Sequence, residues 1–577
     1  MNYANVPKTS AQIALPAWRS RVLFVLLLGG MMSLLVRAVY LQGINNDFLQ
    51  QKGDARYGRV IEVPAHRGMI TDRNGEPLAV STPAETIWAS PPDVDASPKQ
   101  VRQLAGILGM TESDLKARLF DTSREFVYLK RQLPPEQAQK VAMLAIPGIS
   151  MRHEYRRYYP SGEVTSHLLG FTDVDDNGRE GIELAQQEQL GGKVGSLQVI
   201  KDRRGHIVED VASLRAPKEG GDVALSIDSK IQFLAFREIQ QVVEKYQAKA
   251  GSIVVLDAKT GEVMALANWP TYNPNNRIHP ALSVMRNRAV TDLFEPGSTM
   301  KPFTVAAVLE AGKYKPDTMV NTENGRYTIG GRTIHDTHPE HFLSVAQVIQ
   351  KSSNVGAAKM ALSLSPQDFW SSLSENGFGA ATGSEFPGEA TGRLRDFKTW
   401  RPIEQATMSY GNGISVNLLQ LARAYTAFAN DGELMPVTLF KQTTPVMGTK
   451  IYSAATATSV RAMLEMVVGA GGTAPQAQVA GYRVAGKTGT AHKLQNGRYV
   501  DKYVASFVGM APASNPRLIV AVMVDEPAGK EYYGGQVAAP AFSSVMSAAL
   551  RTLDVAYDAP LDNVIVAPVS ALSEEDI

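Results

Sequence analysis

The stretch FEPGSTMKPF, residues 294–303, places a serine and a lysine three positions apart, just behind a Pro-Gly pair. The apolar run that follows predicts a helix ending at Gly312, and Pro302 is tolerated only in or near a first turn, so the helix begins close to Ser298. Positions i and i+3 share a helix face, so the Lys301 amine can reach the Ser298 hydroxyl. Burial and a helix N-terminus both lower the pKa of a lysine. The pair therefore has the form of an activated nucleophile with its base.

The plainer alternative is an ordinary capped helix with a solvated lysine. The same S-x-x-K spacing recurs in SDLK, residues 113–116, where Ser113 is expected to be a helix cap. A catalytic interpretation therefore requires further motifs.

Two further motifs follow in order along the chain. IQKSSNVG ends a short helix that begins at the capping box Ser344-x-x-Gln347. VAGKTGTA is an extended stretch immediately before two predicted strands. The candidate residues of the two motifs are Ser352, Ser353 and Asn354, then Lys487, Thr488, Gly489 and Thr490.

These residue types match the needs of a serine that attacks an amide. Lys301 is the candidate base, and Ser352 with Asn354 offers a proton route to the departing amine. Backbone N–H groups at Ser298 and on the Lys487 strand can stabilise the oxyanion. Lys487 and the hydroxyls that follow it suit an anionic substrate end, and a glycine there admits a close backbone approach.

Single tripeptides are weak signals, since decoys occur elsewhere. Lys259-Thr260-Gly261 lies before the serine and is predicted to turn a hairpin, and Ser374-Glu375-Asn376 is predicted to end a helix before Gly377. The ordered triple in fitting local contexts is a strong signal.

Composition narrows the other possibilities. Across 577 residues, 58 Lys+Arg stand against 57 Asp+Glu, so no nucleic-acid partner is indicated, and the length suggests two or three domains. There is no cysteine, which excludes a thiol nucleophile, cysteine-ligated zinc and disulfides. The segment HDTHPEH contains His335, His338 and His341, but it reads as a loop, so we expect neither a metal site nor a cofactor.

The N-terminus predicts a membrane anchor. Residues 22–36 form an uncharged run, extended to residue 41 past one arginine, and about twenty helical residues span a hydrocarbon core. Three basic residues precede it, which favours a cytoplasmic tail over residues 1–21 and an uncleaved span over residues 22–42, with the rest outside the cytoplasm. A cleaved signal peptide and a buried core helix are the alternatives.

The remainder is expected to be an α+β multidomain chain. Residues 56–217 predict a mixed module without catalytic residues, with a hairpin turning at Arg73-Asn74-Gly75 and a helix capped by Ser97. A linker is expected over residues 216–221. Residues 222–553 predict an antiparallel sheet sandwiched by helices, including two strands of alternating pattern. Residues 554–577 are expected to be a disordered tail.

With these motifs in this order, the sequence resembles the penicillin-binding protein and serine β-lactamase superfamily. The resemblance extends to class B penicillin-binding proteins, the membrane-anchored peptidoglycan D,D-transpeptidases. The elements that carry it in the non-catalytic pedestal, residues 56–217, are RGMITDRNG from Arg67, RRYYPSG around Arg157 and GREGIE ending at Glu183. FEPGST, SSN and NPNN (residues 273–276) resemble the Gram-negative cell-division type, penicillin-binding protein 3.

The resemblance implies transpeptidation of D-Ala–D-Ala stem peptides at the division septum, acylation by β-lactams, and an inner-membrane anchor with the catalytic part in the periplasm. It also implies a SEDS-type glycan polymerase and other division proteins as partners, reached through the membrane span and the pedestal. The charged clusters of the pedestal, such as RRYYPSGE at residues 156–163, are either solvated turns or internal salt links. Aromatic residues would line the acyl-side-chain pocket, for which Tyr503, Tyr532 and Tyr533 are candidates, although core aromatics are the alternative. Rival functions are an elongation-type transpeptidase, a D,D-carboxypeptidase or β-lactam hydrolase, a β-lactam sensor and an inactive scaffold.

Overall fold

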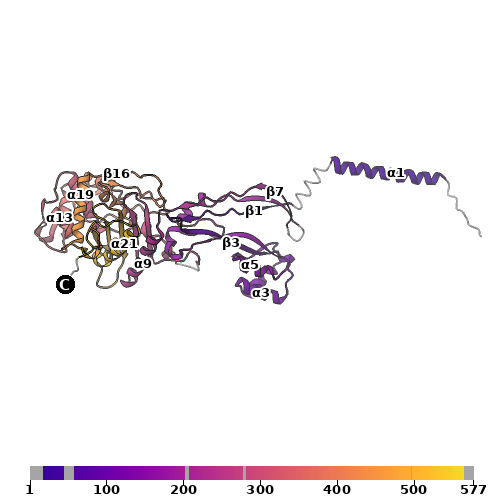
Figure 1. Cartoon of the computed structure of the whole chain (residues 1–577), viewed down its shortest axis with the longest axis horizontal. Helices are drawn as coiled ribbons and strands as arrows, with labels where there is room; N and C mark the ends of the chain where they lie inside the picture. The colour runs from indigo at the N-terminus through magenta and orange to yellow at the C-terminus, as the bar shows by residue number, and fades with distance from the viewer. Residues whose placement is uncertain (1–16, 45–57, 202–206, 277–280, 496, 565–577) are drawn as a thin grey trace, which may run out of the picture.

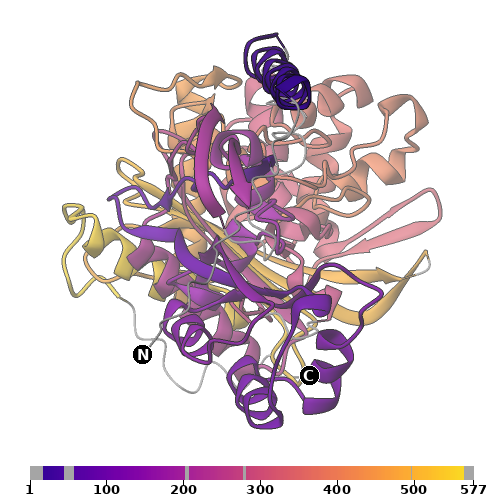
Figure 2. The same ribbon diagram turned by 90° about the vertical axis from the view of Figure 1, so that its right-hand side faces the viewer.

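A computed structural model describes residues 17–44, 58–201, 207–276, 281–495 and 497–564 (Figure 1). A broad C-terminal domain occupies one end, long strands of the pedestal extend from it, and a small helical cluster lies at the far end of those strands. Figure 2 shows the pedestal in front of the wider C-terminal domain.

The N-terminal apolar segment forms one helix. Helix α1 (Ala17–Val39) continues into a π-helical turn, η1 (Tyr40–Ile44). The apolar stretch of 27 residues, Ala17–Gly43, has no part buried against the rest of the protein. At 1.5 Å per residue it is about 40 Å long, enough to cross a hydrocarbon core. The helix begins before the predicted boundary at residue 22, and the preceding tail lies outside the described residues.

The pedestal contains two sheets and a satellite helical cluster. One sheet has the order β1 (Gly58–Val63), β6 (Gly195–Lys201), β7 (Ile207–Arg215). The other has the order β4 (Val127–Leu133), β3 (Pro77–Ala89), β2 (Ile70–Thr71), β8 (Val223–Ala224), with β5 (Ile149–Tyr158) paired to β3. Helices α3 (Pro98–Leu108), α4 (Glu112–Leu119) and α5 (Pro135–Ala142) pack into a separate core.

Local signals in the pedestal predicted its elements well, with one error. The hairpin between β2 and β3 turns through Gly75 at φ 90°, and Ser97 closes a capping box on α3. The cap of α4 is Thr111, however, and Ser113 lies inside the first turn. Thr111 is the N-cap because its side chain accepts a hydrogen bond from the N–H of Asp114, three residues later.

The charged residues Arg67, Arg157 and Glu183 of the pedestal form internal salt links and are not solvated turns. Arg67 and Glu183 are 0% exposed and Arg157 is 5% exposed. Each arginine pairs with Glu183, at 2.7 Å and 2.6 Å. Asp72 is buried as well and accepts from Ser229 at the start of the C-terminal domain. These charges join segments of the fold to one another.

The predicted linker at 216–221 is an ordered, packed segment. Lys218 exchanges backbone hydrogen bonds with Lys193, and the N–H of Gly220 donates to the carbonyl of His66. A Cβ at Gly220 would lie 1.8 Å from the carbonyl oxygen of Leu190. Glycine is thus required here because another part of the backbone lies close by, and not because the segment is a flexible linker.

The C-terminal domain contains the predicted antiparallel sheet between helices. Its strand order is β10 (Val263–Trp269), β9 (Ala250–Asp257), β19 (Leu518–Asp525), β18 (Arg498–Ala511), β17 (Ala485–Gln495). Helices α9 (Ser229–Lys245) and α21 (Ala539–Thr552) cover one face, and α11 (Arg288–Thr291) with α17 (Leu418–Ala424) covers the other. All residues of β9 and β19 are buried, so β19 does not show the expected in–out alternation; helices exclude water from both faces.

The described part of the C-terminal tail packs against this domain. The Tyr482 hydroxyl donates to the carbonyl of Val555, and the N–H of Arg483 donates to Asp558. The Asn563 side chain donates to the carbonyl of Tyr482. The prediction of disorder from residue 554 is therefore wrong up to residue 564, and residues 565–577 lie outside the described residues.

Candidate active site

The serine and lysine of the first motif meet across one turn. A 3₁₀ turn, η4 (Gly297–Met300), runs directly into α12 (Lys301–Glu310), with Pro302 in the first helical turn. Ser298 is half-buried, while Lys301 is 0% exposed. Lys301 Nζ lies 2.9 Å from Ser298 Oγ. The predicted i, i+3 contact is confirmed.

The second motif lies at a sharp turn between two helices. Helix α13 (Val345–Gln350) has the predicted capping box, and Ser353 caps α14 (Asn354–Leu362). Between them Ser352 adopts φ 59°, a left-handed conformation that is costly for a residue with a Cβ. This turn directs Ser352 Oγ and Asn354 Oδ1 to within 3.0 Å and 2.8 Å of Lys301 Nζ.

The third motif closes the site from the sheet. Strand β17 is the edge of its sheet, and its Lys487 is 0% exposed. Lys487 Nζ lies 3.0 Å from Ser352 Oγ. The Ser352 hydroxyl is therefore placed between two buried lysines that come from different elements.

Burial controls the protonation of both lysines. It lowers the pKa of Lys301 to about 7, partly opposed by the negative charge of Asp336. Burial also holds the pKa of Lys487 well below its usual range, and the nearby Lys301 lowers that pKa further. Two ammonium groups around one hydroxyl are unfavourable, so the site favours a neutral amine.

A glycine is required at position 489 for a different reason from the one expected. A Cβ there would lie 2.4 Å from Ser506 Oγ and 2.7 Å from the carbonyl oxygen of Pro296. The missing side chain thus lets β17 pack against the turn that carries Ser298, and the Cβ direction is toward protein. Thr490 Oγ1 accepts from the N–H of Gly534, which anchors α20 (Gly534–Val537) on the strand.

Comparison with known proteins identifies the family. The family described as penicillin binding protein transpeptidase domain matches residues 251–547, and the penicillin-binding protein dimerisation domain matches residues 62–225. The chain is 43% identical to the probable peptidoglycan D,D-transpeptidase PenA of Neisseria meningitidis, over 94% of each chain. It belongs to the class B penicillin-binding proteins. These are peptidoglycan D,D-transpeptidases, and the chain is an enzyme of this type.

Two further comparisons agree. The chain is 42% identical to the peptidoglycan D,D-transpeptidase FtsI of Escherichia coli K12, over 94% of this chain and 93% of that one. The solved transpeptidase domain of Burkholderia pseudomallei penicillin-binding protein 3 is 50% identical, with a TM-score of 0.54, and covers 58% of this chain and 98% of that one.

In this penicillin-binding protein the three candidate tyrosines form one aromatic stack. The rings of Tyr503 and Tyr532 stack with centroids 4.1 Å apart, and those of Tyr532 and Tyr533 stack at 4.5 Å. Tyr503 and Tyr532 are partly exposed and Tyr533 is exposed, so the alternative of core aromatics is wrong. Tyr503 lies on β18 opposite His492 of edge strand β17, and Tyr533 immediately precedes α20.

The histidine segment contributes to the site through residues that motif reasoning missed. Among the described residues no group of histidine and acidic side chains could hold a metal ion. Instead, Asp336 accepts from the Ser353 hydroxyl, and the carbonyl of His335 accepts from Asn354 Nδ2. In the sequence Asp336 is recognisable only as an aspartate just beyond a strand. Nothing near it indicates that its hydrogen-bond partners begin 17 residues later.

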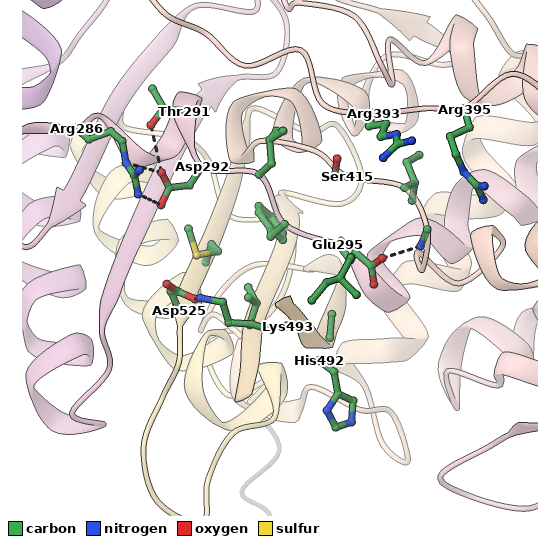
Figure 3. A pocket seen from close by; sticks show the side chains of 18 residues that line it. Arg286, Thr291, Asp292, Glu295, Arg393, Arg395, Ser415, His492, Lys493 and Asp525 are labelled. Carbon is green, nitrogen blue, oxygen red and sulfur yellow. Dashed lines mark hydrogen bonds and ion pairs between the residues drawn. The ribbon is translucent and has the colours of Figure 1, made fainter. Parts of the chain in front are cut away.

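A cavity of about 620 Å³ lies beside the residues that precede Ser298 in the penicillin-binding protein (Figure 3). Glu295 points into it and accepts from the N–H of Gly413, while Arg286 pairs with Asp292 and Lys493 pairs with Asp525 at the opposite end. Ser298 does not line this cavity. Ser298 instead contacts Lys301, which in turn contacts Ser352.

Proposed function

We propose that the chain cross-links peptidoglycan stem peptides at the division septum, through an acyl-enzyme on Ser298 with Lys301 as the base. One observation carries the proposal. Lys301 Nζ is close to two atoms that only accept, the Ser352 carbonyl and Asn354 Oδ1, and to the Ser298 and Ser352 hydroxyls. A neutral amine gives its two N–H groups to the two acceptors and keeps its lone pair for a hydroxyl proton.

Acylation follows from this arrangement. Ser298 Oγ attacks the carbonyl carbon of the terminal D-Ala–D-Ala amide while its proton passes to Lys301 Nζ. Backbone N–H groups of Ser298 and of edge strand β17 stabilise the oxyanion. The C–N bond then breaks, the proton reaches the departing amine by way of Ser352, and D-Ala leaves.

The second half-reaction reverses these roles. An amine of a neighbouring stem attacks the ester, its proton passes to Lys301, and the Ser298 oxygen takes a proton back as the C–O bond breaks. A β-lactam enters by the same attack, but the opened ring stays tethered to the acyl group, so the ester persists.

In this proposal the other candidate residues either bind substrate or support the residues that do. Asn354 orients the donor amide, and Lys487, Thr488 and Thr490 hold the terminal carboxylate. Ser353 supports Asn354, Gly489 admits the strand beside the turn, and Tyr503, Tyr532 and Tyr533 contact the acyl side chain.

Labelling with a fluorescent penicillin tests the nucleophile. We expect one stable adduct, on the peptide that contains Ser298, and none in Ser298→Ala. Label retained in that variant, or found on Ser113, would remove Ser298 from the mechanism.

The septal assignment rests on the similarity to FtsI and PenA over nearly the whole chain. We further propose that α1 anchors the chain in the inner membrane with residues 1–21 in the cytoplasm and the rest in the periplasm. In this proposal a pedestal over residues 56–217 supports a catalytic domain over residues 222–553.

The same proposal gives α1 and the pedestal a partner of the SEDS glycan-polymerase type and other division proteins. Because Arg67, Asp72, Arg157 and Glu183 are buried, docking would use exposed pedestal side chains such as Phe126 and Met143. Substitutions there are expected to leave penicillin labelling intact and abolish complementation of division. If every variant that loses function also loses labelling, the partner proposal fails.

A further inference from the structure

Asp336 holds the start of the helix that carries Asn354. It lies just after β13 (Arg332–His335), where its own N–H donates to the carbonyl of Gly325. Its Oδ1 accepts from the N–H groups of Asn354 and Val355, at 2.5 Å and 2.9 Å, and its Oδ2 accepts from the Ser353 hydroxyl at 2.6 Å. One carboxylate thus takes three hydrogen bonds from the first residues of α14.

This contact sets the orientation of Asn354 in two ways. Asp336 holds the backbone of Asn354, and the carbonyl of the neighbouring His335 takes Asn354 Nδ2 at 2.9 Å. With Nδ2 engaged, Oδ1 is the atom that faces Lys301 Nζ, at 2.8 Å. The loop before α13 therefore decides which end of the amide meets the lysine.

Asp336 also places a negative charge close enough to act on the buried Lys301. The charges and titratable groups around Lys301 are Lys487 from β17, Asp336 from the β13 loop, and Tyr410, a neighbour of Asp336. Burial raises the pKa of Tyr410 to about 12, so it carries no charge at neutral pH. Among these groups Asp336 supplies the opposing negative charge.

An ordinary helix cap is the simpler role, and the chain contains one for comparison. At the start of α15 (Pro366–Glu375), Asp368 accepts from the Ser365 hydroxyl at 2.7 Å on an exposed surface. Asp368 shares the contact with a capping serine, but it belongs to its own helix, three residues after that serine.

We propose that Asp336 is a positioning residue of the acylation reaction: it holds Asn354 against Lys301 and keeps a negative charge near Lys301. This inference rests on the proposed function, since it acts through Asn354 and Lys301. It assigns a role to the histidine-rich segment that does not involve a metal.

The test compares Asp336→Asn, Asp336→Ala and the matched control Asp368→Asn in the full chain. Acylation by a chromogenic β-lactam is followed from pH 5 to 9, with the binding constant and the acylation rate resolved separately. Asp336→Asn keeps the acceptor oxygen and removes the charge, so we expect the acid limb of the rate to move to lower pH by about one unit. Asp368→Asn should match the wild type.

Asp336→Ala removes both functions of the carboxylate. We expect its plateau acylation rate to fall about 10- to 100-fold, the effect of misplacing a reacting group. Asparagine at this position should restore most of that loss. A purely structural cap would instead lower the melting temperature and leave the pH profile of Asp336→Asn unchanged.

Two results would overturn the inference: an Asp336→Asn profile that superimposes on the wild type, or an Asp336→Ala protein that acylates at the wild-type rate. If Asp336→Ala does not fold, the pH profile of the acylation rate of Asp336→Asn decides whether the inference holds. Peptide mapping of the wild-type adduct separates this inference from the proposed function. Label on Ser298 with unaffected Asp336 variants refutes only the role of Asp336, whereas label elsewhere refutes the proposed function.

Discussion

At the scale of single residues, the site depends on the protonation of Lys301. Its pKa is lowered to about 7 by burial, against the charge of Asp336. In the proposed mechanism the neutral amine accepts the Ser298 proton, so the acylation rate should rise about tenfold per pH unit below 7 and level off above it. A stopped-flow profile with a β-lactam measures this. A rate that stays flat from pH 5 to 9 would contradict a lysine base.

Removing the amine gives the second residue-scale prediction. Lys301→Ala should lose about 10²- to 10⁴-fold in acylation rate, the usual contribution of a general base. Asn354→Ala should lose less, because the amide orients groups and does not act as the base. The exposed Lys313→Ala is the control and should acylate normally. Near-normal acylation by a folded Lys301→Ala protein would exclude the lysine as base.

At the scale of elements, the contact between edge strand β17 and the serine turn is a steric one. Gly489→Ala introduces a Cβ at 2.4 Å from Ser506 Oγ and 2.7 Å from the carbonyl of Pro296. The strand or the turn must shift, at a cost of about 1–3 kcal/mol, and acylation should fall with it. Thermal melting and penicillin labelling measure the two effects.

A matched glycine should respond in the opposite direction. Gly106 lies inside α3, and a Cβ there meets no atom within 4 Å. Gly106→Ala should therefore stabilise the pedestal by up to about 1 kcal/mol and leave labelling unchanged. If Gly106→Ala destabilises the protein and Gly489→Ala does not, then Gly106, and not Gly489, is the position that does not tolerate a Cβ.

At the scale of the whole molecule, buried charges join the segments of the pedestal. Glu183→Gln leaves the Arg67 and Arg157 guanidinium groups buried with weaker partners, and breaking such a pair costs about 3–5 kcal/mol. The exposed pair of Glu112 with Arg102 is the control, where Glu112→Gln should cost at most about 1 kcal/mol. The pedestal transition in a denaturant melt shows the difference; equal midpoints would mean that the network contributes little.

The anchor gives a second prediction at this scale. No part of the apolar window Ala17–Gly43 is buried in the rest of the protein. A chain that begins near residue 50 should therefore be soluble and still be labelled by penicillin. If it aggregates or fails to label while the full chain labels in detergent, residues before 50 contribute to the globular fold.

The sequence by itself determined the features that depend on neighbours along the chain. These include the i, i+3 contact of Ser298 and Lys301, the capping boxes at Ser97 and Ser344, the hairpin turn at Gly75 and the apolar N-terminal helix. Their causes are local: helix periodicity, the capping of free N–H groups, and backbone conformations open to glycine. The order of the three motifs was likewise sufficient to indicate the family.

Only the tertiary structure decided which distant residues meet. It placed the Ser352 hydroxyl within 3.0 Å of Lys487, 135 residues later in the chain, and brought Asp336 to the start of α14. It also buried Arg67 and Glu183 against each other, 116 residues apart in the chain. Desolvation, steric contact and the pairing of buried charges arise when separate elements pack together. No local pattern encodes those neighbours, so a motif reveals the reacting groups but not the residues that position them.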